Sequence, residues 1–93
     1  MLRSSEKVRK RKVLLSLLRQ ARLDAGLRQA DVAQRLGKPQ SFVSNYESGE
    51  RRLDLLELEM VCKALDVELL EFVRRFSRAD QVRTARFEGD HAS

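Results

Sequence analysis

The side chains best suited to recognising another molecule lie in one short segment, QSFVSNYES, at residues 40–48. Val43 and Tyr46 fall at the spacing of an inward helical stripe. The outer face of such a helix then carries small polar residues, namely Gln40, Ser41, Ser44, Asn45 and Ser48. Gln and Asn can each form two hydrogen bonds with adenine, and Ser can bond to several bases. The segment therefore favours contact with base edges in a DNA groove.

Phe42 also lies outside the inward stripe of this helix. Two interpretations stay open for its ring. It can pack against a neighbouring helix or a dimer partner, or it can contact a thymine methyl group or a sugar.

A helix that contacts bases must project from the surface at an angle fixed by a partner helix. The pattern predicts that partner over residues 29–36, with Val32, Ala33 and Leu36 on its buried side. Ala33 is small enough to let the two helices approach closely. Gly37 permits the backbone reversal between them, and the stiff, branched Val43 can lock the second helix onto the first. Together these residues predict a helix-turn-helix.

Three further helices are predicted around this pair, over residues 13–25, 55–65 and 68–75. Ninety-three residues suffice for one small domain with a single core. No strand pattern or internal repeat is evident, so we expect an all-α domain of five short helices over residues 13–76. Residues 77–93 are polar and aperiodic, and we expect them to form a flexible tail.

The charge of the chain is unevenly distributed. Ten basic and three acidic residues fall within 1–35, against nine basic and eleven acidic residues afterwards. This asymmetry predicts an anionic partner, either nucleic acid or a membrane surface. Residues 1–12 are strongly basic, and two compatible interpretations stay open: a solvated arm or the frayed start of the first helix, and an arm lying near phosphates. Val8 gives this segment almost no apolar face, which disfavours the membrane.

Enzymatic function is disfavoured by the residues available. His91 lies in the expected tail, Cys62 falls on a buried stripe, and no phosphate-binding glycine loop or metal-ligand spacing is present. We therefore expect no catalytic residues, no metal and no cofactor. No apolar run could span a bilayer and no export signal is evident, which predicts a cytoplasmic protein.

The chain resembles the phage repressor/Cro family of helix-turn-helix regulators, also called the XRE family. The resemblance rests on LRQARLDAGLRQADVAQRLG, QSFVSNYESGERRL and LEMVCKALDV, in the family's order and spacing. It implies a compact five-helix lambda-repressor-like domain, with the helix-turn-helix at helices two and three, that usually works as a homodimer.

The resemblance also implies roles for individual residues. Gln29 would contact a DNA phosphate at the start of the second helix. Gln40, Ser41, Ser44 and Asn45 would face the major groove, while Arg51 and Arg52 would contact phosphate or the adjacent minor groove. Arg22 would pair with Glu47 and hold the recognition helix in place.

Three positions depart from the family pattern. Lys38 occupies an apolar turn position, so its stem can cover the core while its ammonium group reaches a phosphate. Pro39 replaces the usual Ser or Thr N-cap of the third helix and removes a capping bond. Asp66 replaces a Gly, at a modest cost in the left-handed region.

The function expected from these features is sequence-specific binding of double-stranded DNA by a repressor or regulator, as a homodimer on a palindromic operator. The alternative is an antitoxin that binds a protein toxin and represses its own promoter. Leu70 and Phe76 bear on this choice, since they can complete the core, form a homodimer seam or contact a protein partner.

Overall fold

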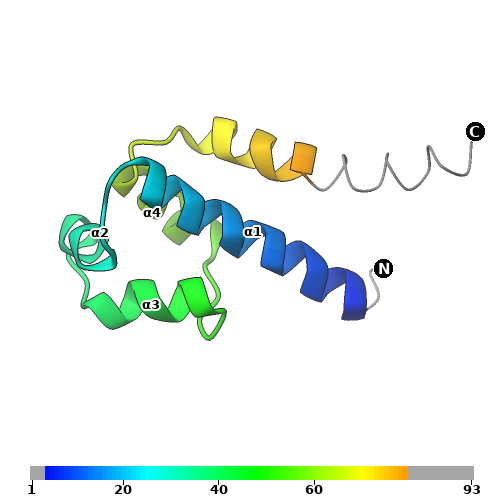
Figure 1. The fold of residues 1–93 in the computed structure, drawn as a ribbon, viewed down its shortest axis with the longest axis horizontal. Coiled ribbons are helices and arrows are strands. Elements are labelled where there is room, and N and C mark those ends of the chain that lie inside the picture. Colours follow the sequence, from blue (N-terminus) through cyan, green and yellow to red (C-terminus); the bar gives the residue numbers. More distant parts are fainter. Residues whose placement is uncertain (1–3, 80–93) are drawn as a thin grey trace, which may run out of the picture.

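The computed structural model describes residues 4–79 of the chain, and every regular element in that range is a helix. The helices are α1 (Ser4–Asp24), α2 (Gln29–Leu36), α3 (Gln40–Ser48) and α4 (Leu55–Ala64), followed by a helical segment over residues 69–79 (Figure 1). The prediction of an all-α domain with five helices is confirmed. None of the described helices is long and apolar enough to cross a membrane.

Two helices are longer than the sequence pattern predicts. The first was expected to begin near residue 13, but α1 begins at Ser4, so the basic segment from residue 4 onward is helical. Lys and Arg are good helix formers, and Glu6 lies in the first turn, where a negative charge is favourable. The last helix continues past residue 75 to residue 79. Most of the expected tail, residues 80–93, lies outside the described residues.

The helix ends follow the local sequence. Asp54 and Glu57 form the predicted capping box of α4, with Glu57 N–H donating to Asp54 Oδ1 at 2.8 Å and Asp54 N–H donating to Glu57 Oε1 at 3.0 Å. Pro39 begins α3 without a side-chain cap, as its side chain dictates. Gly37 ends α2 with φ 67°, and the following N–H of Lys38 donates to the Ala33 carbonyl at 2.9 Å. Gly37 thus makes the tight turn between α2 and α3.

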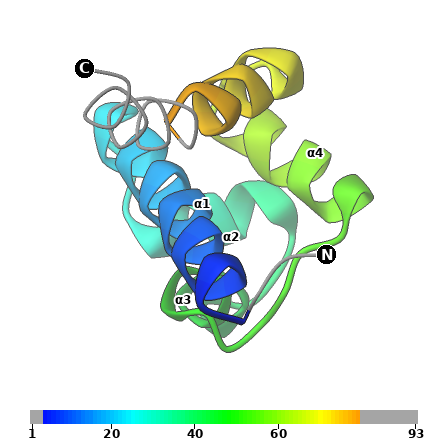
Figure 2. The same ribbon diagram turned by 90° about the vertical axis from the view of Figure 1, so that its right-hand side faces the viewer.

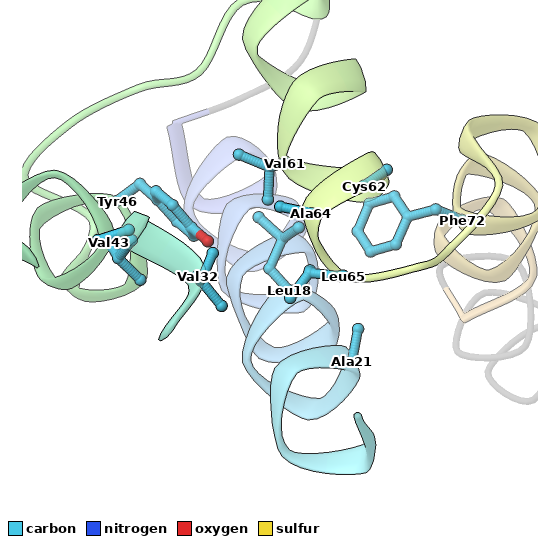
Figure 3. Close-up of a cluster of buried hydrophobic side chains, with 11 residues drawn as sticks. Leu18, Ala21, Val32, Val43, Tyr46, Val61, Cys62, Ala64, Leu65 and Phe72 are labelled. Atoms are coloured by element: carbon cyan, nitrogen blue, oxygen red, sulfur yellow. The ribbon is translucent and has the colours of Figure 1, made fainter. Parts of the chain in front are cut away.

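One apolar core joins all five helices. Leu18 of α1 is fully buried between Val32 of α2, Val61 of α4 and the neighbouring Leu65 (Figure 3). Phe72 closes the core from the helical segment over 69–79. The remaining buried members of this cluster are Ala21, Ala33, Val43, Tyr46, Cys62 and Ala64. This core sets the position of α3 relative to α1 and α2.

Tyr46 places a polar atom inside that core. Its side chain is fully buried, and within residues 4–79 its hydroxyl has no hydrogen-bond partner. Burial raises the pKa of the Tyr46 hydroxyl well above its usual value, so the group stays neutral. An unpaired buried hydroxyl costs stability, because the group loses its hydrogen bonds to water on folding.

Replacing this tyrosine with phenylalanine is therefore expected to stabilise the domain. Tyr46→Phe should raise the free energy of unfolding by about 1 kcal/mol, because the variant keeps the ring and removes the unpaired group. Urea unfolding followed by circular dichroism measures the change. Tyr46→Leu, which also discards ring packing, should be less stable than Tyr46→Phe. A loss of stability in Tyr46→Phe would show that the hydroxyl has a favourable partner.

Candidate nucleic-acid interface

Helices α2 and α3 pack against each other and present α3 at the surface (Figure 1). Ala33 and Val43 lie in the contact and are 3% and 0% exposed. A larger residue than Ala33 would force the helices apart, because cores are packed without spare room. With Val43 and Tyr46 directed inward, the opposite face of α3 is left to solvent.

The outer face of α3 carries the polar residues predicted to contact bases. Gln40 and Ser41 are exposed, and Ser44 and Asn45 are half-buried. The Ser44 hydroxyl donates to the Ser41 carbonyl at 3.4 Å, so it is partly engaged within the helix. No hydrogen bond joins the Gln40 or Asn45 side-chain amide to another residue between 4 and 79. These two amides can therefore bond to a ligand without breaking an internal contact.

Behind this face, a buried ion pair ties α1 to the end of α3. Arg22 is 8% exposed, and its Nε donates to Glu47 Oε2 at 2.7 Å while its Nη2 donates to Oε1 at 3.1 Å. The third guanidinium nitrogen, Nη1, donates to the Leu27 carbonyl at 3.0 Å. The hydrogen bond to Glu47 raises the pKa of Arg22 above its ordinary value. Two parallel bonds fix orientation as well as distance, so this pair holds α3 in register with α1.

Gln29 joins the same network from the start of α2. Its Nε2 donates to Glu47 Oε1 at 3.1 Å, so the carboxylate binds side chains from α1 and α2 together. The family resemblance assigns Gln29 to phosphate contact, and here its amide nitrogen faces a carboxylate. Its backbone N–H remains at the helix N-terminus, near Gln40 of α3. A phosphate contact from Gln29 is therefore best assigned to the side-chain oxygen's neighbourhood through the backbone N–H rather than to Nε2.

Phe42 packs toward the core rather than outward from α3. Its ring meets that of Tyr46 edge to face, with centroids 5.8 Å apart and planes at 78°. The Arg51 guanidinium carbon lies 4.8 Å from the Phe42 centroid and Lys38 Nζ lies 5.7 Å from it. Of the two interpretations left open by the sequence, the geometry matches helix packing.

The two arginines after α3 differ in their surroundings. Arg51 forms an ion pair with Glu57 and donates from Nη1 to the Arg52 carbonyl at 3.3 Å. Part of its charge is therefore neutralised within the domain. Arg52 is exposed, and its guanidinium has no ion pair within residues 4–79. Lys38 is exposed as well, at the turn before α3. Lys38 and Arg52 thus present cations on both sides of the recognition helix.

Sequence reasoning missed one contact of the basic N-terminal segment. Arg11 of α1 donates from Nη2 to the carbonyl of Gly49, the residue that ends α3. The spacing contained a sign of this contact, because Arg11 lies seven residues before the fully buried Leu18 and thus on the same side of the helix. The segment is therefore attached to the recognition helix.

The fold and this surface together define a helix-turn-helix DNA-binding domain, with α3 as the recognition helix. Residues 18–72 match the family model described as Helix-turn-helix, which covers more than half of the chain. The chain belongs to this family, in its XRE branch, whose members are DNA-binding transcription regulators.

Solved structures agree with this assignment. An XRE-family-like protein from Pseudomonas syringae pv. tomato str. DC3000 is 36% identical, with a TM-score of 0.77 over 81% of this chain and 92% of that one. The restriction-modification controller protein C.Esp1396I is 23% identical, with a TM-score of 0.69 over 74% and 88% of the two chains. The clp gene regulator ClgR from Corynebacterium glutamicum is 20% identical, with a TM-score of 0.70 over 89% and 88%. The last two show likeness of fold alone. No curated protein matches the sequence.

Proposed function

We propose that this protein is a sequence-specific transcriptional repressor that binds a palindromic operator as a homodimer. The observation that carries the proposal is the outer face of α3. There Gln40 and Asn45 have uncommitted amides, and the ion pair of Arg22 with Glu47 fixes the helix that bears them. Rigidly held donors and acceptors of this kind suit hydrogen bonding to base edges in the major groove.

Phosphate contacts are assigned to the residues that flank α3. The start of α2 at Gln29 lies on one side, and Lys38, Arg51 and Arg52 supply cations near the turn and after the helix. Such contacts set the register of the protein on the duplex and contribute affinity for any sequence. Within this proposal Phe42 supports the recognition helix from beneath, because its ring lies against Tyr46.

A homodimer is supported by apolar side chains on the helical segment over 69–79. Leu70 is 67% exposed and Val73 is 42% exposed, although both lie next to the buried Phe72. Phe76, the other residue considered for such a seam, is half-buried. Exposed apolar residues grouped on one helix are typical of an interaction surface. The antitoxin alternative would place a protein toxin on this same surface.

Selection of bound duplexes from random DNA tests the proposed function. A homodimer should enrich sites with twofold symmetry whose half-sites lie about one helical turn apart, roughly 10 bp. Repeating the selection at higher salt should retain the same sequence while affinity falls, because phosphate contacts release counterions. Enrichment of no site, together with co-purification of a second polypeptide at equal stoichiometry, would contradict the repressor and favour the antitoxin.

A further inference from the structure

One face of α1 changes from apolar to basic along its length. Leu18 is fully buried, Leu14 is packed against the core, and Arg11 and Lys7 continue the same face toward the N-terminus at helical spacing. Because α1 is continuous from Ser4 to Asp24, this face extends beyond the core as a row of cations. The distance from Leu18 to Lys7 along the axis is about 16 Å at 1.5 Å per residue.

This basic face lies beside the loop that follows α3 (Figure 2). The two segments border a groove whose floor consists of leucines from α1 together with Leu53. Four cations surround that floor, two from α1 and two from the loop: Lys7, Arg11, Arg51 and Arg52. Residues far apart in sequence thus place like charges around one depression, which repels other cations and attracts an anion.

The groove is attached to the end of the recognition helix. Arg11 donates to the Gly49 carbonyl, so the basic turns of α1 keep a set position relative to α3. Arg51 is engaged with Glu57 and the Phe42 ring. The side chains of Lys7 and Arg52 have no hydrogen bond or ion pair to other residues in the described part of the chain. These two cations are the ones available to an external anion.

We propose that Lys7 and Arg52 bind backbone phosphates of duplex DNA beyond the carboxyl end of α3. This inference rests on the proposed function, which places the outer face of α3 in the major groove. The start of α2 lies near Gln40, at the opposite end of α3. Phosphate contacts then bracket the recognition helix at both ends. Since phosphates are the same in every sequence, this site adds affinity and salt dependence without changing base preference.

Lys7→Gln tests the site, with Lys12→Gln as the matched control. Lys12 carries the same charge on α1 but borders a different depression, together with Val8, Val13 and Ser16. Fluorescence anisotropy would compare both variants with the unaltered chain on an enriched duplex and a mixed-sequence duplex, over a series of KCl concentrations. Lys7→Gln should lower affinity roughly fivefold near 150 mM salt on both duplexes, and reduce the salt slope by about 0.9, as expected for one lost phosphate contact. Lys12→Gln should change neither by a comparable amount.

Ethylation interference on the enriched duplex provides a second measurement, because it locates individual phosphates. Ethylation of a phosphate outside the recognition sequence should weaken the unaltered protein and leave Lys7→Gln unaffected. Equal losses in Lys7→Gln and Lys12→Gln, or no loss in either, would overturn the inference while leaving the proposed function intact. A protein that binds neither duplex would contradict the proposed function itself. Circular dichroism verifies that each variant retains its helix content.

Discussion

Replacing Glu47 with alanine is expected to lower the free energy of unfolding by about 3 kcal/mol, at the lower end of the range for breaking a buried ion pair. Glu47 and Arg22 are only 6% and 10% exposed at their side chains. The substitution leaves the Arg22 guanidinium buried, with the Leu27 carbonyl as its remaining partner. Gln29 also loses its acceptor. Thermal and urea unfolding both measure the loss.

Two further variants separate the ion pair from general effects of removing a carboxylate. Glu59→Ala removes an exposed glutamate of α4 and should change stability by no more than about 0.5 kcal/mol. The double variant Arg22→Met with Glu47→Leu should recover most of the stability, because it removes both charges instead of stranding one. If Glu47→Ala were as stable as Glu59→Ala, the pair would contribute nothing to the fold.

Replacing Gln40 or Asn45 with alanine is expected to relax base preference at particular positions of the operator. Each variant should lose about 1–3 kcal/mol of discrimination, or roughly 5- to 150-fold, at the base pairs it contacts. The physical reason is that a bidentate amide bonds only one pattern of donors and acceptors on a base edge. Their stability should change little, since both side chains lie on the outer face of α3. Selection and sequencing of bound sites for each variant gives the measurement.

Arg52→Gln provides the contrast for those two substitutions. Its guanidinium is exposed after α3, so its loss should weaken binding about equally on every sequence and reduce the salt dependence. An array in which Arg52→Gln changed base preference, while Gln40→Ala and Asn45→Ala weakened all sequences alike, would reverse the assignment of this surface.

The local features of the fold could be predicted from the sequence. Helical spacing of apolar residues placed α2 and α3 correctly, because a helix must bury one stripe whatever it packs against. Gly37 marked the turn, and Asp54 with Glu57 marked the start of α4, since capping involves residues within one turn of each other. The start of α1 could not be predicted in this way. A strongly charged helix without an apolar stripe lacks the pattern that identifies helices.

The partners of long polar side chains were decided only by the tertiary structure. The sequence could show that Phe42 lies off the inward stripe of α3, but its ring turns toward Tyr46 because α4 and Arg51 provide the remaining surface. Gln29 donates to Glu47, and Arg11 to Gly49, across large separations in the chain. Periodicity determines which face of a helix a residue occupies. Which neighbour that face meets depends on how the shared core orients the helices, and this orientation assembles the DNA-binding surface.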